Sequence, residues 1–163
     1  MLEHGFPPVY DANSRILILG SFPSVKSREQ QFYYGHPRNR FWPLLAALLE
    51  EELPRTIEEK KSLLKTHHIA LYDALERAEI KGSMDADIKD LEAADLSGII
   101  KNSKIGKIYC NGRKSFEIVT RHMGLEAVLL PSTSPANAAW SFERLLEAWS
   151  VILLDGGMGE RLD

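Results

Sequence analysis

The chain has 163 residues, 44% of them hydrophobic, which is enough for one domain with a substantial core. Its net charge of −3 argues against binding nucleic acid over the whole surface, and its one cysteine, Cys110, excludes an internal disulfide and a four-thiolate iron–sulfur cluster. The N-terminus lacks a signal peptide and no stretch reaches the ~18 apolar residues of a membrane helix, so we expect a cytoplasmic protein with no membrane partner.

The first expected strand follows a lead-in that we expect to be irregular. Residues 1–14 contain two adjacent prolines and an Asp-Ala-Asn-Ser run, both typical of loops. The apolar run that follows is typical of a buried strand at residues 15–19. This strand ends in a turn at residues 20–24. Since ligands bind at the carboxyl ends of the strands in open α/β sheets, the turn is a candidate part of a site.

Helical and strand patterns alternate along the rest of the chain. Apolar residues recur at helical spacing after residue 40 until Pro54 stops the pattern, and Thr56 with Glu59 forms a capping box for the next helix. Residues 73–76 follow an expected strand but could equally be helical, and Gly82-Ser83 indicates a loop. We expect strands at residues 15–19, 69–72, 107–111 and 127–130, and helices at residues 41–52, 56–66, 95–101, 115–122 and 138–153.

This alternation predicts an α/β fold with helices on both faces of a parallel sheet. We expect a single domain of three layers, α/β/α, around a central, mostly parallel four-stranded sheet. No repeat, low-complexity tract or linker divides the chain. Cys110 lies in an apolar run, and we interpret it as a buried free thiol rather than a nucleophile.

Basic residues gather in two segments of this mildly acidic chain. Residues 20–42 carry four basic side chains against one glutamate, and residues 97–123 carry six against one. A local basic face can bind a phosphate backbone even when the net charge is negative. Solvated helix faces explain the second segment equally well.

Two loops rich in serine and proline follow the first and the last expected strands, at residues 20–24 and 132–137. Ser134 is a good N-cap and Pro135 a good first residue for a helix. A helix N-terminus suits a phosphate because its backbone N–H groups are free and its dipole is positive there. An ordinary capped helix explains the second loop by itself, whereas the two loops together favour a pair that binds phosphate.

The segment between these loops has an unusual composition for a structural loop. Within residues 35–42, Arg38 and Arg40 flank Asn39, next to a histidine, a proline and two aromatic residues. We interpret Phe41 and Trp42 as core residues. The two arginines fit phosphate contacts and solvated side chains equally well.

The turn 20–24, the segment 34–42 and the sequence Ser134-Pro135-Ala136-Asn137 together resemble the motifs of the uracil-DNA glycosylase superfamily. The middle segment is similar to the His-Pro-x-Asn-Arg-Phe-Trp run of mismatch-specific enzymes, and the last is similar to the Ser-Pro-x-Asn of single-strand-selective enzymes. The whole pattern most resembles the hypoxanthine-DNA (deoxyinosine) glycosylase branch. The resemblance implies one uracil-DNA glycosylase-like domain over residues 1–163.

Two residues depart from the superfamily pattern. Phe22 stands where an acidic residue or asparagine usually activates or orients water, and Ser132 stands where a histidine or asparagine usually binds the base carbonyl. The resemblance to the hypoxanthine branch therefore implies that Asn39 takes the catalytic role. Its neutral amide cannot act as a carboxylate base, but its C=O can accept from a water molecule and aim it while its NH₂ group donates to a second group.

The resemblance also implies how a pocket would hold an extruded base. Tyr34 takes the position of the aromatic residue that stacks on the base, although a half-buried core tyrosine fits the same pattern. Backbone N–H groups of residues 21–24, with either the Ser132 hydroxyl or His36, would stabilise the departing base. Residues 136–139 lie where related enzymes insert an apolar wedge but carry no large apolar side chain, which suits a base pair that is already unstable. The expected base-pocket residues are Ser21, Phe22, Pro23, Ser24, Tyr34, His36 and Ser132, and the expected DNA contacts are Arg38, Ser134, Pro135, Ala136 and Asn137.

Together these features predict a monofunctional DNA glycosylase of base excision repair. It would flip a deaminated base, hypoxanthine first with uracil and xanthine as further substrates, and hydrolyse its bond to deoxyribose. We expect DNA containing deaminated bases as the partner, a monomer, and no metal or other cofactor. Two alternatives stay open: a mismatch-type uracil-DNA glycosylase, and a non-catalytic relative that binds damaged DNA.

Overall fold

A parallel sheet of four strands forms the centre of the molecule. In the computed structural model, which describes residues 2–80 and 88–155, the strand order of this sheet is β3-β2-β6-β7. The strands are β2 (Ile16–Gly20), β3 (Ile69–Asp73), β6 (Lys107–Asn111) and β7 (Val128–Leu130), and all neighbours pair in parallel. The expected α/β fold with a parallel four-stranded sheet is confirmed.

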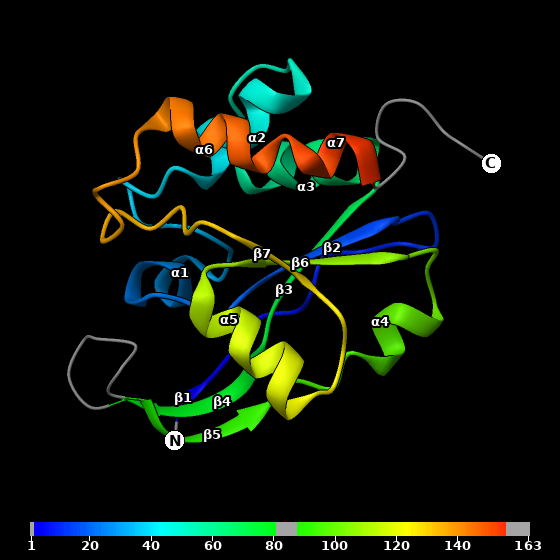
Figure 1. The fold of residues 1–163 in the computed structure, drawn as a ribbon, viewed down its shortest axis with the longest axis vertical. Coiled ribbons are helices and arrows are strands. Elements are labelled where there is room, and N and C mark those ends of the chain that lie inside the picture. Colours follow the sequence, from blue (N-terminus) through cyan, green and yellow to red (C-terminus); the bar gives the residue numbers. More distant parts are fainter. Residues whose placement is uncertain (1, 81–87, 156–163) are drawn as a thin grey trace.

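Helices cover both faces of this sheet (Figure 1). One face carries α2 (Phe41–Leu49), α3 (Ile57–Thr66), α6 (Phe142–Trp149) and α7 (Val151–Asp155), and α5 (Arg113–Glu117) packs on the other. Every residue of β2 and β3 is buried as a result, and both strands are apolar up to their last residue. Large buried side chains, among them Trp149, Tyr109 and Phe41, fill the space around the sheet.

A second, smaller sheet lies below α5 in Figure 1. It contains β1 (Leu2–Glu3), β4 (Leu75–Ile80) and β5 (Ile88–Ala93), all antiparallel, with β4 in the middle. The lead-in is irregular over most of its length, as expected, but its start forms β1, which pairs with β4, and Val9 bridges to Leu71. The segment after β3 becomes a strand because this long-range pairing satisfies its backbone groups, and the local sequence pattern does not contain that information.

Helix ends follow the caps that the chain supplies. The capping box of α3 is confirmed, since Thr56 Oγ1 accepts from Glu59 N at 3.0 Å and the Glu59 carboxylate accepts from Thr56 N at 3.3 Å. α2 ends earlier than expected because Glu50 adopts a left-handed conformation with φ of 57°. α4 (Ser97–Lys101) is confirmed, and α5 runs directly into a π-helical turn, Ile118–His122. The loop expected at Gly82-Ser83 lies outside the described residues.

The carboxyl ends of the central strands are brought together on one side of the molecule, beside α1 (Val25–Gln30) and the loop after β7 (Figure 1). The sequence pattern does not predict α1, whose N-cap is Ser24: its Oγ accepts from Ser27 N at 3.1 Å. Cys110 is buried and has a free thiol, as expected. Among the described residues, no helix is long and apolar enough to span a membrane.

Candidate active site

A cavity of about 560 Å³ lies at the carboxyl edge of the central sheet. Its walls come from residues 20–28 and 132–135, from the segment around Tyr34, and from the ends of β3 and β6. This is the edge at which ligands bind in open α/β sheets. The expected residues that line the cavity are Ser21, Phe22, Pro23, Ser24, Tyr34, His36, Asn39, Ser132, Ser134 and Pro135.

Asn39 lies in the wall of the cavity with its side-chain oxygen fully engaged. Its Oδ1 accepts from the backbone N–H of Phe41 at 2.9 Å and from the hydroxyl of Thr133 at 2.8 Å. A backbone N–H can only donate, so the engaged atom is the oxygen, and both of its lone pairs are used. The oxygen that was expected to aim a water molecule is therefore already engaged by the protein. The NH₂ group is the part of Asn39 that can still bind a ligand.

A buried chain of hydrogen bonds fixes Asn39 in this orientation. Thr133 is fully buried and donates its hydroxyl to Asn39, while Asn111 Nδ2 donates to the same hydroxyl at 3.0 Å. Thr133 N in turn donates to Asn111 Oδ1 at 3.0 Å. Such connected networks are rigid because each group is held by its neighbours. The sequence analysis did not identify Thr133, and it placed Asn111 at the end of a strand.

Tyr34 is held in the cavity wall by a neighbouring ring. It adopts a left-handed backbone conformation with φ of 55°, and its ring stacks on Phe41 with centroids 4.1 Å apart. Its hydroxyl is buried, with the Asn111 amide nearby. Burial and then the nearby Asp73 carboxylate raise the pKa of Tyr34 far above its usual range, with the Asn111 amide acting in the opposite direction. The hydroxyl of Tyr34 is therefore neutral. The neighbouring residues Phe41 and Trp42 are buried, as expected.

A buried carboxylate that the sequence analysis missed also lines the cavity. Asp73, the last residue of β3, is 4% exposed, and its Oδ2 lies 2.7 Å from Nε2 of the fully buried His4. Gly20 occupies the equivalent strand end in β2 and pairs with Asp73 in register. The polar residue at the end of an apolar strand was the signal in the sequence, and Asn111 at the end of β6 carries the same signal.

The loop after β7 does not begin a helix at Ser134, so the expectation of a phosphate site at a helix N-terminus there is wrong. Ser134 Oγ accepts from Ala136 N at 3.1 Å within a turn, and α6 starts later, capped by Ser141. Arg40 explains this difference, because its guanidinium donates to the carbonyl groups of Ser134, Asn137 and Trp140. A helix beginning at Pro135 would need the first of these carbonyls for its own ladder.

The chain matches known proteins along most of its length. The family model for the uracil DNA glycosylase superfamily covers residues 7–152. This chain belongs to the uracil-DNA glycosylase superfamily. A hypoxanthine DNA glycosylase from Methanosarcina acetivorans is 41% identical over 156 residues, which is 93% of this chain and 98% of that protein. Another from Methanosarcina barkeri is 39% identical over 142 residues, which is 84% of this chain and 89% of that protein.

A solved structure has the same fold. It is the solution NMR structure of a Methanosarcina acetivorans protein provisionally named a uracil DNA glycosylase, with a TM-score of 0.79, 40% identity, and coverage of 93% of this chain and 96% of that one. The family and these relatives make the present chain a DNA glycosylase, a hydrolase of N-glycosyl bonds that acts on DNA.

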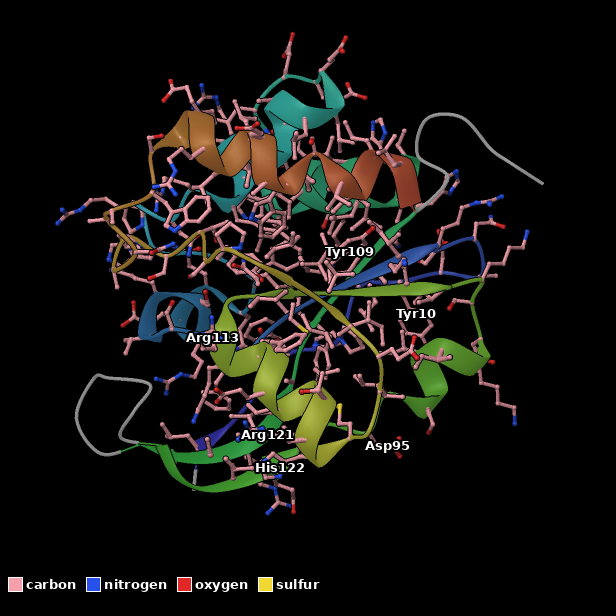
Figure 2. All side chains as sticks on the ribbon, in the orientation of Figure 1. Tyr10, Asp95, Tyr109, Arg113, Arg121 and His122 are labelled. Carbon is pink, nitrogen blue, oxygen red and sulfur yellow. The ribbon has the colours of Figure 1, made fainter. Side chains whose placement is uncertain are left out.

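Basic side chains of this glycosylase surround the mouth of the cavity. Lys26 and Arg28 from α1 line it, as do Arg113 and Lys114 at the start of α5. Figure 2 shows Arg113 at the end of α5 nearest to α1, whereas Arg121 lies at the far end of the following π-helical turn. The second basic segment is therefore divided, and only its part next to the cavity is placed to meet a phosphate backbone close to the site.

Three of the expected DNA contacts lie outside the cavity lining. Arg38 is exposed, and its backbone N–H donates to His36 Nδ1 at 3.1 Å. Ala136 is exposed in the loop after β7. Asn137 is partly buried and donates from Nδ2 to Ser132 O at 3.0 Å, so its amide holds the loop in shape. Arg40 is partly buried, and its guanidinium binds carbonyl groups of the loop after β7.

Proposed function

We propose that this glycosylase releases hypoxanthine from deoxyinosine in DNA, with uracil and xanthine as further substrates, as one domain over residues 1–163. The observation that carries the proposal is the cavity at the sheet edge, whose volume of about 560 Å³ lies within the ~300–1,000 Å³ range of small-molecule sites. Its lining combines the fixed amide of Asn39, the ring of Tyr34 and a basic mouth. Relatives at about 40% identity are hypoxanthine DNA glycosylases, which supports the same base here.

The reaction needs a group that stabilises the departing base. Hydrolysis of an N-glycosidic bond passes through an oxocarbenium-like state, and negative charge develops on the base as it leaves. Asn39 suits this role as a hydrogen-bond donor, since its oxygen is engaged and its NH₂ group is available. A donor held rigidly before the reaction stabilises developing charge without reorganising. Asn39 thus acts on the base rather than as an acceptor for the attacking water.

Other residues of the cavity would bind and orient the base. Tyr34 and Phe22 offer aromatic surface to an extruded base, which loses its stacking in the duplex. The Ser132 hydroxyl or His36, with backbone N–H groups of residues 21–24, adds donors near the same cavity. Residues 136–139 carry no large apolar side chain, so extrusion would favour pairs weakened by deamination. We further propose that the protein acts as a monomer, in the cytoplasm and without a cofactor.

Base release from labelled oligonucleotides tests the proposal. Duplexes and single strands with one deoxyinosine, deoxyuridine or deoxyxanthosine are treated with enzyme and then with alkali, and the released base is identified by chromatography. We expect release of hypoxanthine, reduced by about 100-fold in Asn39→Ala. Asn102→Ala is the matched control, because Asn102 is exposed and bonds only within its own helix turn. Lesion binding without release of any base would establish the non-catalytic alternative instead.

A further inference from the structure

A buried carboxylate–imidazole pair lies against the cavity, and the proposed role of Asn39 does not account for it. His4 Nε2 donates to Asp73 Oδ2 at 2.7 Å, and the side chains of the two residues are 0% and 6% exposed. Burying such a pair is often no more stabilising than burying apolar residues of the same size. A buried carboxylate in the wall of a ligand cavity is therefore better explained by binding a ligand than by stabilising the fold.

The surroundings of His4 fix which carboxylate oxygen is left over. Its ring packs against Phe6 and Tyr72, with centroids 4.4 and 4.5 Å away. Its Nδ1 has no partner among the described residues, so the contact with Oδ2 is the hydrogen bond that orients both side chains there. Asp73 consequently keeps Oδ1 as an acceptor that the pair does not use.

Gly20 keeps the space next to this oxygen open. A Cβ atom built on Gly20 would lie 2.5 Å from Asp73 Oδ1, closer than any real contact of that kind. Gly20 and Asp73 lie opposite each other in register, and both line the cavity. The absence of a side chain at position 20 thus leaves a carboxylate oxygen within reach of a ligand.

Deamination changes the same feature in two bases. The N1 atom of adenine and the N3 atom of cytosine are acceptors without a hydrogen, whereas N1 of hypoxanthine and N3 of uracil carry one. A carboxylate accepts hydrogen bonds and cannot donate. It attracts the N–H of the deaminated base and repels the lone pair of the normal base. Guanine and xanthine both carry N1–H, so this contact would not separate those two.

We propose that Asp73 Oδ1 accepts a hydrogen bond from the ring N–H of the extruded base, and that this contact selects hypoxanthine and uracil over adenine and cytosine. His4 is the positioning residue that holds Oδ2. The proposal deepens the proposed function and rests on it. A site built to bind a substrate N–H strongly rejects an analogue that lacks it, because the buried acceptor is then left without a partner.

The test compares two substrates that differ at this one position. Single-turnover release is measured from oligonucleotides with deoxyinosine or 1-methyldeoxyinosine, in which a methyl group replaces the N1 hydrogen. In the wild-type enzyme we expect methylation to slow release about 10- to 100-fold, the range for a hydrogen bond to a charged group. In Asp73→Ala the two substrates should differ by only about twofold, because the contact is already lost.

The arms of this experiment separate the possible failures. No release of hypoxanthine by the wild type would overturn the proposed function itself. Release at equal rates from both substrates by the wild type would overturn only the contact with Asp73, and this arm does not depend on how a variant folds. An equal loss on both substrates in Asp73→Ala would also overturn it, because a general base or a structural residue acts on every substrate alike.

Matched variants show whether the effect belongs to this carboxylate and its partner. Glu76→Ala removes a nearby carboxylate that bonds to the Tyr72 hydroxyl at 2.7 Å and lies outside the cavity lining, so the substrate ratio should stay at the wild-type value. His4→Gln keeps an N–H donor for Oδ2 and should preserve most of the ratio, whereas His4→Leu should lose it. An unchanged ratio in His4→Leu would contradict the positioning role of His4.

Discussion

The two sides of the cavity are built on different physical principles. One side is neutral, a chain of hydrogen bonds from Asn39 through Thr133 to Asn111. The other contains a carboxylate, Asp73, bonded to the buried His4, and we call it the ionic side. On the neutral side, Asn39 uses its oxygen within the protein and offers its NH₂ group to a ligand. On the ionic side, His4 donates to one oxygen of Asp73, which leaves the other oxygen as an acceptor for a ligand.

This difference predicts different consequences of damage. Removing one hydroxyl from a neutral network costs a hydrogen bond but leaves the packing nearly unchanged. Disturbing a buried carboxylate leaves charge without compensation, and the fold itself loses stability. Variants of the neutral side should therefore mainly slow the reaction, and variants of the ionic side should also alter stability and base selection.

The largest expected effect comes from Gly20→Ala on the ionic side. The added Cβ meets Asp73 Oδ1 at 2.5 Å and the Tyr34 hydroxyl at 3.2 Å, so the carboxylate and the ring must move. We expect unfolding to become easier by about 1–3 kcal/mol, as for other overpacked sites. Release of hypoxanthine should fall by about 100-fold, which is typical of a misplacement near 1 Å.

Denaturant unfolding and single-turnover release measure both effects. Gly98→Ala is the control, because nothing lies within 4 Å of a Cβ at that position in α4. Alanine in the helix should leave the rate unchanged and slightly raise the free energy of unfolding. Wild-type rates in Gly20→Ala would show that Asp73 does not need its present position.

A smaller effect is expected from Thr133→Val on the neutral side. Valine keeps the shape of the side chain but removes the hydroxyl that joins Asn39 to Asn111. Asn39 Oδ1 still accepts from Phe41 N, so its amide is loosened rather than released. We expect about a 10-fold slower release and a loss of only about 0.5–1.5 kcal/mol in the free energy of unfolding, the net value of one hydrogen bond.

The ratio of deoxyinosine to 1-methyldeoxyinosine release in Thr133→Val separates the two sides of the cavity. It should keep its wild-type value, because Asp73 is not disturbed. Thr120→Val removes a hydroxyl that bonds only to Phe116 O, away from the cavity, and serves as the control for the rate. A changed substrate ratio in Thr133→Val would mean that the two sides act as one network.

The same comparison shows what sequence patterns can and cannot predict. The four central strands are predictable because each is a continuous apolar run, and Asn39 is predictable because it lies in a recognisable motif. The role of His4 is not predictable, since it depends on a contact with Asp73, which lies 69 positions away in the sequence. The start of α6 fails for the same reason, because Arg40 holds the carbonyl of Ser134 across 94 positions.

Asp73 is an intermediate case. Its place after the apolar part of β3 matches that of Gly20 in β2 and Asn111 in β6, and parallel strands bring such positions to one edge. That signal is local and was available in the sequence. The burial of the carboxylate and the identity of its partner depend on β1, which exists only through pairing with β4.

The smallest expected effect concerns the basic mouth, which serves both sides of the cavity equally. Arg113 lines the cavity, whereas Arg121 lies at the other end of the same helical segment (Figure 2). If Arg113 contacts a phosphate, Arg113→Gln should change the salt dependence of DNA binding. The slope of the logarithm of the association constant for duplex DNA, plotted against the logarithm of the salt concentration, should become shallower by about 0.9. Arg121→Gln, the matched control, should leave the slope unchanged. Equal slopes in both variants and the wild type would favour the alternative of a solvated helix face. Base selection should be unchanged in every case, because phosphate contacts carry no sequence information.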